Sequence, residues 1–209
     1  MRALACATAL LACSCYSFTT IGRARTLPKR GLELFAAPGI RAIATPSGDP
    51  NIRPTIDVGA RYGASDRVDV GIRAGEWGAA AAGRIQLVRG ATKETGVDVL
   101  VAPGLAYTLT DKLAFELPVA FGINLRGENQ IVLAPRFVHQ MRFGVGDLDR
   151  PAQFVFLGAS LGFVWQIGRN VALMPEFGML FGVYAEPGFT SFTTPGPGIQ
   201  AALGVLWDR

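Results

Sequence analysis

The sequence has few charged residues and no long apolar run. Charged side chains make up 17% of the 209 residues and apolar side chains 50%, whereas soluble domains carry roughly 25% charged residues. No stretch approaches the run of about 18 apolar residues that marks a membrane-spanning helix. Strands that cross a membrane as a barrel give a much weaker hydropathy signal, so this absence excludes spanning helices only.

Cysteine and histidine are almost missing. The three cysteines, Cys6, Cys13 and Cys15, all lie in the first fifteen residues, and His139 is the single histidine. The body of the chain therefore has no disulfide framework and no thiolate metal site. No phosphate-binding glycine loop, zinc spacing or dinucleotide fingerprint is present, so we expect no cofactor and no metal. The net charge of +4 comes from scattered arginines, which argues against nucleic acid as a partner.

Glycine and proline are abundant, with 26 and 13 residues, and helix formers are few, which favours an all-β fold. The alternation is clearest in the hairpin from Phe154 to Val183, where large apolar residues take every second position on both arms. Gly168-Arg169-Asn170 forms its turn. Each arm runs over about a dozen residues, whereas strands of soluble domains average about 5–6 and membrane-barrel strands need about 9–11.

The same period recurs along the chain and predicts an antiparallel up-and-down transmembrane β-barrel of about ten strands, with eight or twelve as alternatives. Short turns at 65–66, 91–96, 126–129 and 168–170 would lie at the periplasmic end, together with both termini. Longer loops at 45–51, 144–151 and 187–197 would lie outside. The ten expected strands cover residues 31–41, 52–63, 67–75, 81–88, 97–107, 113–123, 131–143, 154–167, 171–184 and 199–207.

The face opposite the large apolar residues is rich in glycine and carries isolated arginines and acids, which suits a narrow lumen better than a solvated surface. Opposite charges on neighbouring strands can pair there, which lowers the cost of burial. Six aromatic residues near strand ends are expected at the membrane interfaces: Tyr62, Trp77, Tyr107, Trp165, Tyr184 and Trp207. The expected lumen charges are Glu33, Arg53, Asp57, Arg61, Asp69, Arg73, Arg84, Asp98, Glu116, Arg136 and Glu176.

Six prolines interrupt the expected strands, where each removes a ladder donor, and we expect bulges near the strand ends to absorb some of them. They are Pro38, Pro54, Pro103, Pro118, Pro135 and Pro175.

The N-terminus has the basic start and small apolar run of a secretory signal. Leu10-Leu11-Ala12-Cys13 resembles the lipobox of bacterial lipoproteins, which implies cleavage after residue 12 and lipidation of Cys13. Ser14 resembles the class that is sorted to the outer membrane. The alternative is an ordinary signal with incidental cysteines. The expected domains are a signal peptide at 1–12, a lipidated N-terminus and polar linker at 13–30, and the barrel at 31–209.

Residues 31–207 resemble small bacterial outer-membrane β-barrel proteins, including lipid-anchored barrels of unknown role in Gram-negative bacteria. The resemblance implies an outer-membrane location and outer-membrane lipids as partners. The chain ends Trp207-Asp208-Arg209, whereas the assembly signal of that family usually ends on an aromatic residue.

Three functions follow from this sequence. The first is a structural or interaction barrel whose lumen is plugged by ion pairs. The second is a narrow channel or transporter for small solutes. The third is a lipid-anchored soluble binding barrel or an outer-membrane hydrolase, for which Ser160 and His139 would have to share one face. The sequence favours the first function and a protein that is not an enzyme.

Overall fold

The computed structural model describes residues 17–44, 50–109, 111–143, 151–185 and 197–209. These residues form eleven strands in one antiparallel sheet and one short 3-10 helix, η1 (Arg126–Glu128). The strands are β1 (Leu32–Ile43), β2 (Asn51–Ser65), β3 (Val68–Gly75), β4 (Gly78–Val88), β5 (Val97–Val101), β6 (Gly104–Thr108), β7 (Lys112–Leu125), β8 (Asn129–Arg142), β9 (Ala152–Gln166), β10 (Val171–Ala185) and β11 (Gly198–Asp208).

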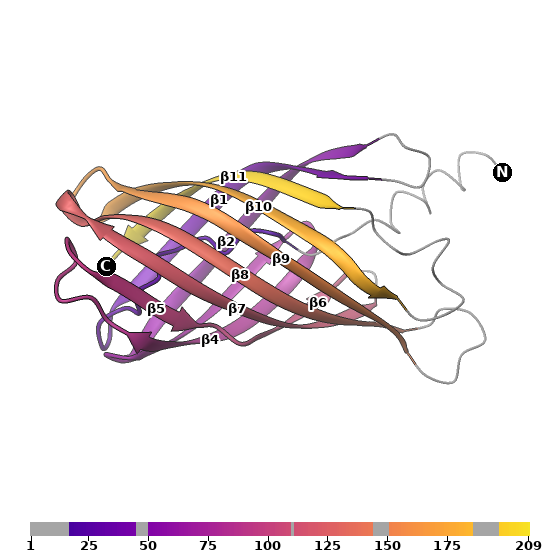
Figure 1. Ribbon diagram of the computed structural model, residues 1–209, viewed down its shortest axis with the longest axis horizontal. Coiled ribbons are helices and arrows are strands. Elements are labelled where there is room, and N and C mark those ends of the chain that lie inside the picture. The colour runs from indigo at the N-terminus through magenta and orange to yellow at the C-terminus, as the bar shows by residue number, and fades with distance from the viewer. Residues whose placement is uncertain (1–16, 45–49, 110, 144–150, 186–196) are drawn as a thin grey trace.

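The sheet closes on itself into a barrel (Figure 1). β1 pairs with β2 and also with β11, in a register that runs from Glu33 opposite Asp208 to Ile43 opposite Gly198. β5 and β6 both pair with β4 on one side and β7 on the other, so they are two halves of one strand position. The barrel therefore has ten strand positions, and the predicted fold class is confirmed.

The prolines disturb the sheet less than the sequence predicts. The break between β5 and β6 falls at Ala102 and Pro103, where proline has no N–H to donate. The pairing register continues through the other five expected prolines. The bulges lie elsewhere, at Gly63–Ser65, Gln86–Val88 and Gly182–Tyr184, so the expectation that bulges absorb prolines is wrong for the described strands. One lost ladder bond in a long antiparallel strand leaves the neighbouring bonds to hold the register.

The outward face is apolar and the inward face is polar. Along β9, for example, Leu157, Leu161 and Trp165 are exposed while Ser160 and Val164 are buried. The same alternation recurs on the other strands, because successive side chains of a strand point to opposite sides of the sheet. No helix among the described residues is long and apolar enough to cross a membrane.

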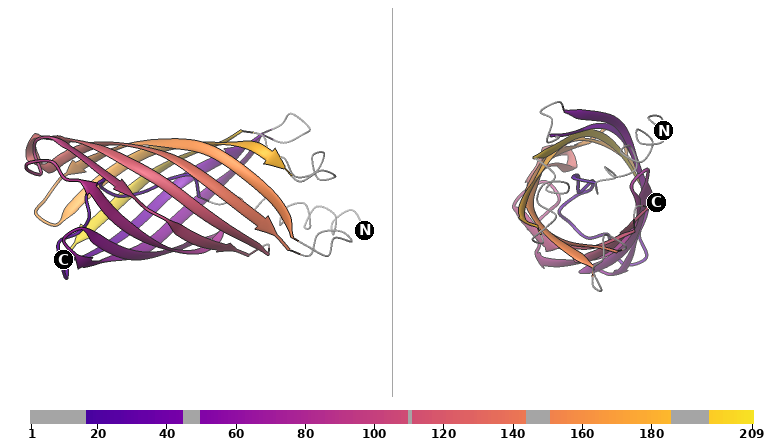
Figure 2. Two further views of the ribbon diagram at one scale, coloured as in Figure 1. Left: turned by 60° about the horizontal axis from the view of Figure 1, so that its bottom comes forward. Right: turned by 90° about the vertical axis from the view of Figure 1, so that its right-hand side faces the viewer.

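Residues 17–30 run inside the barrel, as the view along its axis shows (Figure 2), and we call this segment the plug. The ring of Phe18 lies against Gly198, the first residue of β11, and Pro28 lies against Gly63 near the end of β2. The plug thus runs toward the end where β2 turns into β3, the turn end, and continues into β1. The sequence predicts a linker for these residues, and the structure corrects this, because the plug is part of the barrel interior.

The two ends of the described chain lie apart. Arg209 is at the turn end, where its N–H donates to the Leu32 carbonyl over 2.7 Å. Ser17 lies deep in the lumen, where its hydroxyl donates to Asp57 midway along β2. Among the described residues, the chain approaches the turn end from the opposite end of the barrel, which we call the loop end. The predicted signal and Cys13 lie outside the described residues.

Candidate functional site

The barrel interior is the candidate site, because it collects the charged side chains of the chain. The structure places all eleven expected lumen charges on the inward face. Arg53 and Arg73 are half-buried, and the other nine are buried. Arg41 and Lys112 also face inward and are buried, although the expected set did not include them.

Three ion pairs join members of the expected set. Arg61 pairs with Glu33 at 2.6 Å and Arg84 with Asp69 at 2.8 Å. The partners of each pair stand directly opposite each other on neighbouring strands. The third pair, Arg73 with Glu116 at 3.0 Å, joins β3 and β7, which are separated by β4 and β6 in the sheet. Of the other five members, Asp57, Asp98, Arg136 and Glu176 bind the plug, and Arg53 donates to Asn51 on its own strand.

The wall accepts hydrogen bonds from the main chain of the plug. Along the plug, main-chain N–H groups donate hydrogen bonds to carboxylate and glutamine oxygens of the wall. These buried donors are therefore satisfied. Glu176 takes two of them, one on each oxygen. The pairs are Phe18 with Gln200 (2.9 Å), Thr20 and Ile21 with Glu176 (2.6 and 2.8 Å), Ala24 with Gln130 (2.8 Å), Thr26 with Gln86 (2.6 Å) and Leu27 with Asp69 (3.0 Å).

Arginines of the wall donate to the main-chain carbonyls of alternate plug residues. A guanidinium group carries five N–H donors in a fixed fork, so one arginine can hold a carboxylate and a carbonyl together. Arg84 does this, since it pairs with Asp69 and also reaches two carbonyls. The pairs are Arg136 with Ser17 (3.1 Å), Arg73 with Thr19 (3.0 Å), Arg61 with Ile21, and Arg84 with Arg23 (3.1 Å) and Arg25 (2.9 Å).

Several plug side chains also make polar contacts with the wall, namely those of Ser17, Thr20, Arg23, Arg25 and Thr26. Arg25 forms an ion pair with Asp98 at 2.9 Å, and the Ser17 hydroxyl donates to Asp57 over 2.7 Å. The Thr20 hydroxyl accepts from Arg136 over 2.6 Å. These contacts fix where along the lumen the plug sits.

Glycines on the inner wall make room for the plug. A Cβ at Gly178 would overlap the carbonyl of Phe18, and one at Gly63 would overlap the carbonyl of Pro28. At Gly122 a Cβ would come within 2.7 Å of the Ala24 methyl. The glycine-rich phase of the strands therefore reflects a lumen shaped around a second piece of chain.

The wall also contains groups that the sequence analysis missed. Gln86, Gln130 and Gln200 are buried acceptors for the plug, and they occupy the same phase as the lumen charges. Their phase could have identified them. The plug itself gave no such signal, because its residues lack the period of a strand.

Trp77 corrects one expected role. It is buried in the lumen, where its indole N–H donates to Asp57 over 2.5 Å and Arg73 lies 5.2 Å from its ring. It sits in the tight connection between β3 and β4, from which its side chain folds inward instead of toward the membrane interface. The other five expected interface aromatics are exposed on the outside.

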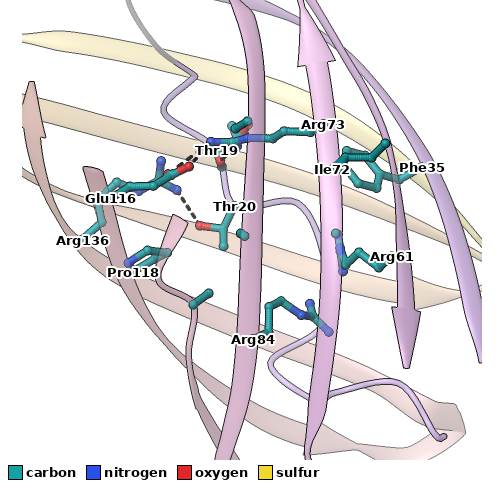
Figure 3. A pocket seen from close by; sticks show the side chains of 14 residues that line it. Thr19, Thr20, Phe35, Arg61, Ile72, Arg73, Arg84, Glu116, Pro118 and Arg136 are labelled. Atoms are coloured by element: carbon teal, nitrogen blue, oxygen red, sulfur yellow. Dashed lines mark hydrogen bonds and ion pairs between the residues drawn. The ribbon is translucent and has the colours of Figure 1, made fainter. Parts of the chain in front are cut away.

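A cavity of about 70 Å³ remains between the plug and the wall. Arg61, Arg73, Arg84, Arg136 and Glu116 line part of it (Figure 3). Ligand pockets for small molecules are typically about 300–1,000 Å³, whereas this space suits a few waters at about 30 Å³ each.

The pair of residues that a hydrolase would need does not form. Ser160 is buried in the lumen, where its hydroxyl lies 2.9 Å from that of Thr20. His139 is on the outward face, 3.3 Å from Gln153. The part of the chain that the structure describes also has no group of three or more His, Cys, Asp or Glu residues arranged to hold a metal ion.

No protein-family model and no curated protein matches the chain. Three solved structures share its outline. Neisserial surface protein A (NspA) is 11% identical, with 84% of this chain and 96% of that chain covered and a TM-score of 0.45. The N-terminal barrel domain of Pseudomonas aeruginosa OprF is 12% identical, with 88% and 100% covered and a TM-score of 0.42. Yersinia pestis Ail is 10% identical, with 86% and 99% covered and a TM-score of 0.32.

At these identities and scores, no activity transfers from those proteins to this chain. The fold rests on the strand pairing of the chain itself. It is an antiparallel β-barrel with ten strand positions, and its own N-terminal segment occupies the lumen.

Proposed function

We propose that this protein is an integral outer-membrane barrel that its own plug closes, with a structural or interaction role instead of transport. The exposed apolar face supports a membrane location. Large apolar side chains face outward around the barrel, whereas the charged ones are turned inward. In water this arrangement would leave a continuous apolar surface exposed, and a bilayer would cover it.

The lengths of the strands and the positions of the aromatic residues support the same location. β2, β9 and β10 have 15 residues each, enough to cross a hydrocarbon core that needs about 9–11. Exposed aromatics mark both ends. Tyr62, Trp165 and Trp207 lie at the turn end, and Tyr107 and Tyr184 lie at the opposite end, as interfacial belts do.

The main evidence that the lumen is blocked is the presence of the plug inside it. Its main chain is hydrogen-bonded to the wall at Phe18 near one half of the lumen and at Leu27 near the other. A narrow barrel has little interior to spare, and the residual cavity of about 70 Å³ is smaller than a solute pocket.

Two measurements on the full-length protein test this proposal. We expect the protein to migrate differently on SDS gels before and after boiling, in outer-membrane fractions, and to give no conductance steps in planar bilayers. Steady steps that Arg61→Ala or Glu116→Ala abolishes would instead support transport. Solubility without detergent of the chain that lacks its first 16 residues would reject the membrane location.

A further inference from the structure

We propose that the lumen is a binding site for a polypeptide segment, and that the plug is the tethered occupant of this site. Another peptide can then take the place of the plug when the plug is displaced. This inference rests on the proposed function, because it requires that the plug fills the lumen.

The first reason is that the wall recognises main-chain atoms. Carboxylate and glutamine oxygens of the wall accept hydrogen bonds from N–H groups of the plug, and arginines of the wall donate to the carbonyls of alternate plug residues. Every residue supplies a carbonyl, and every residue except proline supplies an N–H. A wall that binds these groups does not read side chains through them, provided that the peptide can bend as the plug does at Ile21 and Gly22, where φ is +30° and +137°.

The second reason is that the barrel does not need the plug to close. The β1–β11 pairing and the other ladders involve strand residues alone. The plug contributes no strand to the sheet. If the plug left the lumen, the hydrogen bonds between the strands would remain. The barrel can therefore exist without its occupant.

The contacts of three plug residues indicate which peptides the lumen would bind best. The Phe18 ring lies against Gly198 and 5.9 Å from the Arg41 guanidinium. Gly22 has φ +137°, and a Cβ there would overlap the Arg61 guanidinium. Arg25 pairs with Asp98. The preferred ligand is therefore a peptide with an aromatic residue, a glycine four positions later at which the chain bends, and an arginine three positions after that.

The test uses the full-length protein with Thr20→Pro and Thr26→Pro, which remove two plug N–H donors, those that bind Glu176 and Gln86. The probe is a fluorescein-labelled synthetic peptide with the sequence of residues 17–30, and fluorescence anisotropy in detergent measures its binding. A second probe carries proline at the positions of Thr20 and Thr26. A third carries alanine at the positions of Thr20 and Thr26, which removes the same two side chains as proline but keeps both N–H groups.

We expect the proline probe to bind the variant roughly a hundredfold more weakly than the alanine probe, since both lack the same side chains and only the proline probe loses two hydrogen bonds to buried acceptors. Equal binding of the proline probe would overturn main-chain recognition. A heat-modifiable, conducting variant that binds none of the probes would overturn the peptide site.

The wild-type protein separates this inference from the proposed function. We expect it to bind the first probe at least tenfold more weakly than the variant does, because its lumen is occupied. Equal binding would mean that the plug does not fill the lumen, which refutes the closed barrel itself. If the double-proline protein does not fold, Arg25→Ala weakens the plug through Asp98 instead, and the same three probes apply.

Discussion

A single methyl group added at Gly22 should release the plug from the wall of the lumen. Its φ of +137° lies in a region that residues with a side chain rarely adopt, and an added Cβ would overlap the Arg61 guanidinium. That guanidinium has little freedom to move, because it pairs with Glu33 at 2.6 Å and donates to the Ile21 carbonyl. Gly22→Ala therefore strains the backbone of the plug and also pushes the Arg61 guanidinium out of its buried ion pair.

Both effects are costly. Holding a non-glycine residue in such a conformation costs about 1–3 kcal/mol, and separating one partner from a buried ion pair costs about 3–5 kcal/mol. Each hydrogen bond of the plug contributes only about 0.5–1.5 kcal/mol. The lowest-energy response is for the middle of the plug to leave the wall. The lower limits of the two costs together come to about 4 kcal/mol, which raises the ratio of open to docked plug about a thousandfold, since each 1.4 kcal/mol is tenfold.

Hydrogen–deuterium exchange of residues 17–27 measures this ratio directly, because the amides exchange when the segment opens. We expect exchange of these amides to rise about a thousandfold in Gly22→Ala, while the strands of the barrel stay protected. Gly83→Ala is the matched control, since a Cβ there meets nothing within 4 Å. Unchanged protection of the plug in Gly22→Ala would refute the idea that the Arg61 contact holds it.

Two further predictions concern the faces of the barrel and its N-terminus. In proteoliposomes with brominated lipids, single-tryptophan variants that retain Trp165 or Trp207 should be strongly quenched and the variant that retains Trp77 should not, because only Trp77 is buried in the lumen; equal quenching of all three would contradict this assignment. Cys13→Ser should stop maturation of the precursor on gels if Cys13 is the lipidated residue, and normal processing of that variant would rule lipidation out.

The strands could be predicted from the sequence because their signal is local. The alternation of Phe177 and Glu176 within β10 reports directly which side chain meets the lumen. Strand limits agree within a few residues over most of the barrel. Pro103 shows where local reasoning needed the partner strands, since only pairing with β4 and β7 shows that β5 and β6 share one position.

The plug could not be predicted in the same way, because its conformation depends on distant residues. Thr20 and Ile21 are held by Glu176, 156 and 155 residues away in sequence. The plug has no strand partner and no period, so composition alone made it resemble a linker. The prediction for Trp77 was wrong for a related reason. Its place near a strand end fits an interface residue equally well, and only the buried Asp57 carboxylate decides its direction.

The position of the plug also constrains how the barrel assembles. The plug is at the start of the chain, whereas Gln200, which binds its Phe18 N–H, is 182 residues later on the strand that closes the sheet. Contacts between such distant residues form late, because a long loop must be closed first. The junction of β1 and β11 must therefore seal around a segment that is already inside, or the segment must thread a finished ring. Capture before sealing avoids the threading step, so the last strand to pair would also be the one that locks the plug in place.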